Sequence, residues 1–337
     1  MSPSANTRNS NSRILPPGIY APTQVFFDEG TEELDVATIA THAVRLARAG
    51  IVGIVTNGSN GEAVFLSADE RLLVTQTTRN ALDQAGFSNV PIIVGASDQS
   101  VRGTLKLCND AKRAGGDAVL LLTPSFFKWA MDIPTISRYF TLVADSSPLP
   151  IIIYNYPGAI SGIDLDSELL IKLAEHPNII GTKFTCGNVG KLARVAAETN
   201  SVTELTSIKG QTNYMAFAGI ADIITPSLTV GSSGAIVGAA NVFPRLCVQV
   251  YNLFVAGEYE KAVESQRQLA IADWELTKRG IPGFKAILQH YHKYGGLPRQ
   301  PMGALDVQGK DLLMNVIGDM MERELSLPDM VVGGKKA

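Results

Sequence analysis

The sequence has few cysteines, no long apolar run and little excess charge. Its three cysteines are spread along 337 residues and form no CxxC pair, which argues against a disulfide framework and against a zinc site. No apolar run approaches the roughly 20 residues that a membrane-spanning helix needs. The net charge of −3, with both signs interspersed, disfavours a nucleic acid or an anionic membrane as partner. The cysteines are Cys108, Cys186 and Cys247.

The composition predicts a folded protein with short unstructured ends. Apolar residues make up 45% of the chain and charged residues 18%, so a large core can form. The first residues are rich in Ser and Asn and lack the apolar segment of a secretory signal, so we expect a disordered tail over 1–14 and a cytoplasmic protein. Two arginines and no acidic residue in this tail leave a mitochondrial presequence as the alternative. We expect residues 328–337 to be a loose end.

Short β-rich runs alternate with helical patterns along most of the chain. Eight such units in succession predict a (β/α)8 TIM barrel over residues 15–242. An open doubly wound sheet is the alternative, but no GxGxxG motif follows the first strand, which disfavours its dinucleotide-binding form. The predicted strands are Ile19–Val25, Ile51–Thr56, Pro91–Gly95, Ala118–Leu122, Pro150–Asn155, Ile179–Lys183, Tyr214–Gly219 and Gly234–Gly238.

Helix signals support this order. Asp35 and Asp132 can each cap a helix, and Ser67 with Glu70 forms a capping box. The segment Val202–Gln211 fits either a short strand or a loop. From residue 243 onward only helices are predicted, so we assign 243–327 to an appended C-terminal helical layer. Its helices are Arg245–Ala256, Tyr259–Arg279, Gly283–Tyr294 and Lys310–Glu324.

A single lysine, Lys183, lies in the apolar stretch 178–185, whose composition predicts a buried strand. Burial disfavours the ammonium form of a lysine, so its amine can be neutral near pH 7 and attack a carbonyl carbon. This is the chemistry of a Schiff-base enzyme. The alternative is a strand-end lysine whose amine reaches water and has no chemical role.

Three further segments follow predicted strands and can share a rim with Lys183, because active sites of such barrels lie at the carboxyl ends of the strands. The first offers two glycines and main-chain amides that, with Ser59 and Asn60, can hold a carboxylate. Each segment alone fits an ordinary turn, but all three meet around one lysine. The segments are Asn57–Glu62, Leu122–Phe127 and Ile153–Pro157.

Three motifs stand in order at these strand ends: Gly58-Ser-Asn-Gly-Glu62, Tyr154-Asn-Tyr-Pro157 and Gly181-Thr-Lys183. Together they resemble the signature of the dihydrodipicolinate synthase/N-acetylneuraminate lyase family of pyruvate-dependent class I aldolases. The resemblance runs from about Leu15 to Leu327 and includes the late segments 280–285 and 299–301. The Ser-Asn form of the first motif, like the segment 240–244, is closer to 4-hydroxy-2-oxoglutarate aldolases and fungal 2-keto-3-deoxy-L-galactonate aldolases than to the synthases.

The resemblance implies a role for each matching residue. Lys183 would attack the C2 carbonyl of a 2-keto acid, and Tyr154 would shuttle protons. Ser59 would be the third catalytic residue and, with Asn60 and the loop amides, would hold the keto-acid carboxylate. The resemblance further implies that no metal or organic cofactor is needed, and that the protein is a homotetramer built as a dimer of dimers. The remaining residues assigned to the substrate site are Gly58, Thr185, Gly219, Phe126 and Phe127.

Two departures from the family pattern bear on the substrate. Lysine-pathway synthases carry an arginine shortly after the Tyr-Asn-x-Pro motif, but the segment Gly158–Ser161 has none, which argues against dihydrodipicolinate synthesis. The family places a tyrosine after the fourth strand, where this chain has Phe126 and Phe127, which cannot donate a proton. Trp129 follows, so we expect an apolar mouth and tolerance of apolar or aromatic aldehydes.

Three functions are compatible with these observations. The first is a class I aldolase that reversibly cleaves a 2-keto-3-deoxy or 4-hydroxy-2-keto acid to pyruvate and an aldehyde. The second is a biosynthetic pyruvate-dependent aldolase that acts on an apolar or aromatic aldehyde. The third, of a different class, is a non-catalytic barrel that binds a keto acid, against which the joint presence of Lys183, Tyr154 and Ser59 argues. A metal-dependent aldolase is disfavoured because the sequence shows no ligand cluster.

Overall fold

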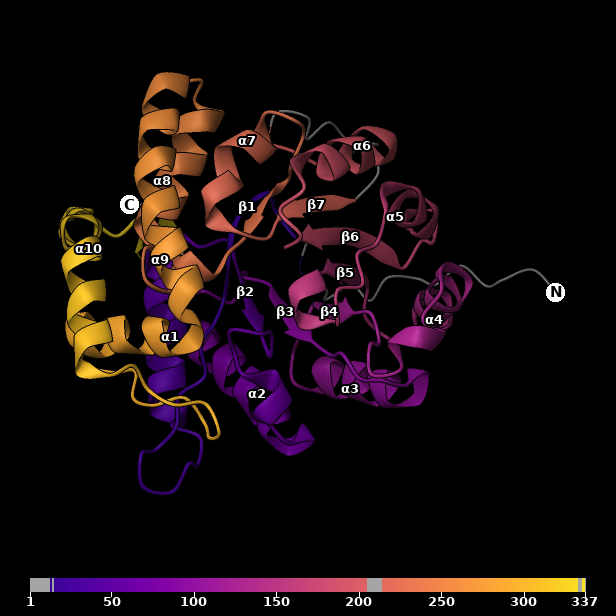
Figure 1. Cartoon of the computed structure of the whole chain (residues 1–337), viewed down its shortest axis with the longest axis horizontal. Helices are drawn as coiled ribbons and strands as arrows, with labels where there is room; N and C mark the ends of the chain where they lie inside the picture. The colour runs from indigo at the N-terminus through magenta and orange to yellow at the C-terminus, as the bar shows by residue number, and fades with distance from the viewer. Residues whose placement is uncertain (1–12, 14, 205–213, 333–334, 337) are drawn as a thin grey trace.

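The computed structural model describes residues 13, 15–204, 214–332 and 335–336. Eight parallel strands close into a barrel in chain order, which confirms the predicted TIM barrel (Figure 1). The observed strands are shorter than predicted at several ends, where the chain turns over the rim. They are β1 Gly18–Pro22, β2 Gly53–Thr56, β3 Ile92–Gly95, β4 Ala118–Leu122, β5 Ile151–Asn155, β6 Ile179–Phe184, β7 Met215–Ala218 and β8 Gly234–Ile236.

Helices surround the barrel, and their first turns carry the predicted caps. The side chains of Asp35 and Asp132 accept hydrogen bonds from amides in the first turns of α1 and α4, and Ser67 and Glu70 form the capping box of α2. The barrel helices are α1 Val36–Arg48, α2 Ala68–Gln84, α3 Val101–Arg113, α4 Ile133–Ser146, α5 Ser167–Ala174, α6 Val189–Thr199, α7 Ile224–Leu228 and α8 Pro244–Val255. Short 3-10 turns follow five strands: η1 Ala63–Phe65, η2 Lys128–Ala130, η3 Pro157–Ala159, η4 Ala221–Ile223 and η5 Gly238–Asn241.

The barrel interior is a packed apolar cluster, as expected when alternate strand residues point inward. Tyr20, Leu120, Ile152 and Phe217 are among its members, and Tyr154 lies at its upper edge. A second, larger cluster fills the space between the strands and the surrounding helices. Polar side chains that share the inward face with this cluster are therefore held in a dry environment.

The appended helices cover one side of the barrel (Figure 1). Because α8 packs against α7 and β1, it takes the place of the eighth barrel helix, and the added layer consists of α9 Tyr259–His292 and α10 Val307–Ser326. The sequence predicts two helices where α9 stands. A break is present at Gly280, whose φ of 58° and ψ of −152° are non-helical, and it separates the two halves of α9.

Both ends of the described chain have specific contacts. Arg13, at the end of the expected tail, forms an ion pair with Asp117 at 3.1 Å. Where a loose end is expected, β9 Val331–Val332 pairs antiparallel with β10 Lys335–Lys336, and the Met330 amide donates to the carbonyl of Arg48. Most of the ambiguous segment Val202–Gln211 lies outside the described residues. No helix in the described ranges is long and apolar enough to cross a bilayer.

Candidate active site

Lys183 lies near the carboxyl end of β6 and is only 3% exposed. Burial lowers the pKa of its amine from 10.5 to about 7, because the ammonium form loses its hydration. Within the described part of the chain, no carboxylate forms an ion pair with this amine that would restore the charge. The predicted buried lysine is therefore present, with its amine poised between the two protonation states at neutral pH.

Tyr154 lies beside Lys183, because the two residues are register partners on β5 and β6. The Lys183 Nζ is 4.1 Å from the centre of the Tyr154 ring. The Tyr154 hydroxyl is 3.5 Å from Ser59 Oγ, a long contact in which either oxygen can donate. Burial raises the pKa of Tyr154, and hydrogen bonds to Ser59 and Thr185 only partly offset this, so the phenol is protonated at neutral pH. It can donate a proton to a group bound at Lys183.

The loop after β2 brings Ser59 and Asn60 to the same end of the barrel. Ser59 is exposed, and no atom lies within 4 Å of the position that a β-carbon on Gly58 would occupy. The later amides of the loop donate to the carbonyls of Gly58 and Ser59. Among the described residues, the amides of Ser59 and Asn60 have no backbone acceptor. These two amides can therefore bind an anionic group, as a carboxylate-holding loop requires.

Gly219 lies against Thr185 at the ends of β7 and β6. A β-carbon on Gly219 would lie 2.0 Å from Thr185 Oγ1 and 2.6 Å from its Cα, so any other residue would displace Thr185. The Thr185 hydroxyl donates to the Gly219 carbonyl at 3.4 Å, and the Thr185 amide donates to Asn155 at 3.0 Å. Gly219 thus makes room for Thr185, and direct contact of either residue with a substrate stays a prediction.

Phe126 and Phe127 lie in the loop between β4 and η2 and are 79% and 57% exposed. Their ring centres are 5.0 Å apart, and Trp129 packs against Phe127 at 6.1 Å. Gln99 holds this loop, since its Oε1 accepts hydrogen bonds from the amides of Ser125 and Phe126. The rings form an exposed aromatic cluster at the end of β4. They pack against each other, and their role in the substrate site stays a prediction.

Two features of this end of the barrel were not assigned a role from the sequence. Tyr156 stacks on Tyr154, with ring centres 5.6 Å apart and an interplanar angle of 25°. Glu62, at the end of the loop after β2, forms a buried ion pair with Lys285 of α9. The sequence offers one signal for this pair, which is that Lys285 stands in an apolar segment. Its partner Glu62 is too distant along the chain to be identified from sequence.

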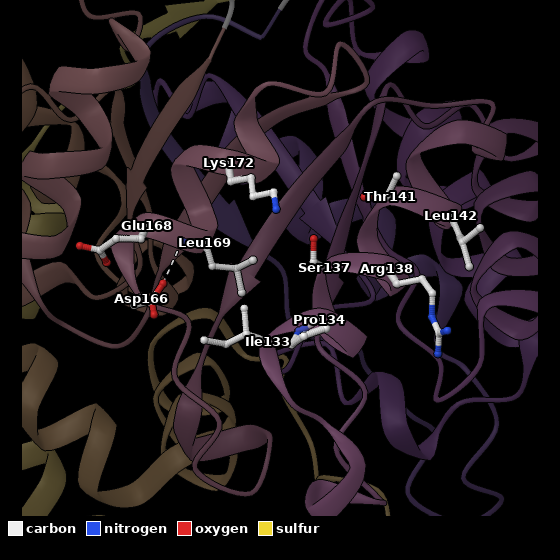
Figure 2. A pocket seen from close by; sticks show the side chains of 10 residues that line it. All are labelled: Ile133, Pro134, Ser137, Arg138, Thr141, Leu142, Asp166, Glu168, Leu169 and Lys172. Carbon is white, nitrogen blue, oxygen red and sulfur yellow. Dashed lines mark hydrogen bonds between the residues drawn. The ribbon is translucent and has the colours of Figure 1, made fainter.

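The described residues also form a groove on the outer surface of the barrel. It has a volume of about 600 Å³ and lies between α4 and α5 (Figure 2). Arg138 and Lys172 line it together with Asp166 and the apolar Ile133 and Leu142. No residue predicted for the substrate site lines it. Among the described residues, no group of three or more His, Cys, Asp or Glu side chains is arranged to hold a metal ion.

Comparison with known proteins places this geometry in a family. Residues 16–319 match the model of the dihydrodipicolinate synthetase family. The L-threo-3-deoxy-hexylosonate aldolase of Aspergillus niger is 50% identical over 329 residues, which cover 94% of this chain and 98% of that protein. The "Probable 4-hydroxy-2-oxoglutarate aldolase, mitochondrial" of Emericella nidulans is 43% identical over 316 residues, with coverages of 94% and 98%.

Solved structures agree with these sequence matches. A protein of the dihydrodipicolinate synthase family from Coccidioides immitis superposes with a TM-score of 0.82 at 33% identity, covering 94% of this chain and 99% of that one. A prophage protein of the same family from E. coli K12, solved in complex with pyruvate, gives 0.79 at 26% identity, with coverages of 90% and 98%. The resemblance predicted from the three motifs is confirmed, and the chain belongs to the dihydrodipicolinate synthetase family.

Proposed function

We propose that this protein is a Schiff-base aldolase that reversibly cleaves a 2-keto-3-deoxy or 4-hydroxy-2-keto acid to pyruvate and an aldehyde. The observation that carries the proposal is the environment of Lys183. Its buried amine has a pKa of about 7 and lies 4.1 Å from the ring of a tyrosine that can exchange protons with it. The other buried lysines, Lys191 and Lys285, each face a carboxylate, whereas no ion pair to Lys183 is found among the described residues.

The residues support each step of such a cycle. The neutral amine of Lys183 attacks the C2 carbonyl of the keto acid, and loss of water gives a protonated imine. When the C3–C4 bond breaks, its electron pair forms the C2=C3 double bond and the imine π pair moves to nitrogen, which leaves an enamine, while the C4 hydroxyl loses its proton and becomes the aldehyde. Protonation of the enamine at C3 and hydrolysis of the imine release pyruvate and restore the amine. Tyr154, in contact with Ser59, is placed to carry these protons.

The substrate class rests on the relatives and on two departures from the family pattern. Relatives at 50% and 43% identity are named as a 3-deoxy-hexylosonate aldolase and a 4-hydroxy-2-oxoglutarate aldolase, so we assign this chain a hydroxylated 2-keto acid. No arginine is present in Gly158–Ser161 to bind the second substrate of a dihydrodipicolinate synthase. The exposed rings of Phe126 and Phe127 favour, as a second candidate, an aldolase for apolar or aromatic aldehydes.

The test is a panel of 2-keto acids assayed for pyruvate release, with borohydride trapping in parallel. We expect release from a 2-keto-3-deoxy sugar acid or from 4-hydroxy-2-oxoglutarate, and a reduced pyruvyl adduct on Lys183. Condensation of pyruvate with aspartate semialdehyde should be negligible. Preference for an arylidene pyruvate would support the second candidate. Binding of pyruvate without an adduct would instead indicate a non-catalytic keto-acid-binding barrel.

We further propose a cytoplasmic homotetramer, built as a dimer of dimers. The exposed aromatic cluster of Phe126, Phe127 and Trp129 supports an interface near the site, because apolar surface of this kind is commonly covered by a partner. A mitochondrial location is the alternative, since the relative from Emericella nidulans carries a mitochondrial name. Sedimentation analysis and microscopy of a C-terminally tagged chain test the two assignments.

A further inference from the structure

A fully buried ion pair connects the C-terminal helical layer to the loop that carries Ser59 and Asn60. Glu62 ends this loop, and its Oε1 lies 2.7 Å from the Nζ of Lys285, in the second half of α9. Neither side chain has any exposed area. Removing two charges from water is unfavourable, so a pair at this depth is poor evidence of a gain in stability and suggests another role.

Other groups satisfy both partners of the pair. The Lys285 Nζ donates to the carbonyl of Leu297 at 2.8 Å and lies 4.6 Å from the centre of the Phe27 ring. The second carboxylate oxygen of Glu62 accepts a hydrogen bond from the Arg299 amide at 2.9 Å. Lys285 and the Arg299 segment therefore hold the carboxylate from two sides, and its position relative to α9 is strongly determined.

The loop needs such support because its two ends are in the left-handed backbone region. Asn57 has a φ of 55° and Glu62 a φ of 48°, which side chains larger than glycine adopt at an energetic cost. Asn57 is held by α2, since its side-chain amide donates to Arg71 O and Thr75 Oγ1. Glu62 is held by the ion pair, so the two anchors together determine where Ser59 and Asn60 lie.

The second half of α9 also reaches Asn60 through a shared neighbour. A β-carbon on Gly238 would lie 3.1 Å from both Asn60 Nδ2 and Phe284 Cζ. The Asn60 amide and the Phe284 ring thus both lie next to this glycine at the end of β8. Phe284 directly precedes Lys285, so this segment of α9 lies close to the loop at Gly238 as well as at Glu62.

We propose that Glu62 and Lys285 are positioning residues, which hold Ser59 and Asn60 in the conformation that binds the carboxylate of the 2-keto acid. This inference rests on the proposed function and adds the C-terminal layer as a determinant of keto-acid affinity. Lys285 is not a second nucleophile, because its amine is paired with a carboxylate and bound to a carbonyl. The pair acts through the loop and does not touch the reacting atoms.

The test compares variants by the pyruvate concentration that gives half-maximal borohydride trapping at Lys183, by kcat and by melting temperature. Lys285→Met leaves the Glu62 carboxylate buried without a counter-charge, so its melting temperature should fall. The double variant Glu62→Gln/Lys285→Met removes both charges, so it should regain most of the melting temperature that Lys285→Met loses. We expect its half-saturating pyruvate concentration to stay raised by about tenfold or more, with kcat at saturation changed by less than about threefold.

Lys278→Met is the matched control, because it removes a lysine of α9 whose pair with Glu275 is exposed. Its trapping and kcat should equal those of the wild type. A double variant with recovered melting temperature and wild-type half-saturation would overturn the inference, since the pair would then be only structural. If the double variant does not fold, Glu62→Gln, which keeps the shape and an acceptor for Arg299, takes its place. A raised half-saturation with little change in kcat then supports the inference, and a wild-type half-saturation overturns it. Failure to trap the wild type with any keto acid would instead refute the proposed function.

Discussion

Lys183 and Lys285 are both buried, and the amine of each lies over an aromatic ring. Their surroundings nevertheless differ in two respects. The ring under Lys183 is Tyr154, at 4.1 Å, whereas the ring under Lys285 is Phe27, at 4.6 Å. Lys285 faces the Glu62 carboxylate at 2.7 Å, and Lys183 has no such partner among the described residues. Burial lowers the pKa of both amines, but at Lys285 the carboxylate opposes that shift.

The difference shows that burial alone does not make a lysine a nucleophile. A neutral amine needs desolvation without a counter-charge, and turnover needs a neighbour that can move protons. The end of β6 meets both conditions, while the second half of α9 meets neither. On the two proposals above, we expect Lys183 to serve chemistry and Lys285 to position the loop.

The largest effect is expected from Lys183→Met, which removes the amine at the site and leaves Lys285 in place. Turnover and borohydride trapping should both be abolished, because the imine forms only at Lys183. Peptide mapping after reduction measures this, with Lys278→Met as the control. An adduct on Lys285 in either protein would break the contrast between the two lysines.

The same Lys183→Met variant should be more stable than the wild type, by on the order of 3–5 kcal/mol at pH 6. Below about pH 7 the wild-type lysine is protonated in both the folded and the unfolded chain, so folding bears the whole cost of burying the charge. Between pH 7 and 10.5 the folded amine is neutral while the unfolded one still binds a proton, so the wild type gains stability as pH rises. The advantage of the variant should therefore shrink toward pH 10. Urea unfolding at several pH values measures it, and an advantage independent of pH would contradict the lowered pKa.

Tyr154→Phe makes the surroundings of Lys183 resemble those of Lys285, since the ring stays and the hydroxyl is lost. We expect turnover to fall by about a hundredfold or more, the scale for losing a positioned acid–base group. Half-saturation in the trapping assay should change much less, because the amine remains. Steady-state kinetics beside trapping separates the two effects. A near-normal kcat would mean that another group carries the protons.

A smaller change in stability, on the order of 2–3 kcal/mol, is expected at a buried carboxylate that has no ion pair among the described residues. Asp273 of α9 accepts hydrogen bonds from the amides of Ala221 and Asp222, and burial, followed by repulsion from the Asp222 carboxylate, raises its pKa to about 6. Below about pH 4 it is neutral in both states. Above pH 6 it is charged in both, so folding bears the full cost of the buried charge.

Asp273→Asn keeps the acceptor oxygen and removes this cost. Its stability relative to the wild type should rise between pH 4 and pH 6 and then level off. Urea unfolding of both proteins across this range provides the measurement. A difference that stays constant with pH would show that Asp273 titrates normally.

Much of the site could be predicted from the sequence, because the chemistry is concentrated in short segments. An apolar run that contains one lysine pointed to Lys183. Tyr154 and the Ser59 loop stand at the ends of predicted parallel strands, which predicts that they lie on the same rim of the barrel. The placement of Phe126 and Phe127 was less accessible. Local sequence shows that they follow a strand, but their exposure depends on how the loop turns against Gln99.

The sequence by itself determined the alternation of strands and helices and the residue types at each strand end, since periodicity and capping are local properties. Only the tertiary structure decided that Lys285 has a counter-charge and that, among the described residues, Lys183 does not. Barrel closure and the packing of α9 bring Glu62 to Lys285, whereas no acidic side chain is brought to Lys183 within the described part of the chain. A pKa depends on every charge and every water molecule excluded around the group, and such surroundings exist only once distant segments have packed together.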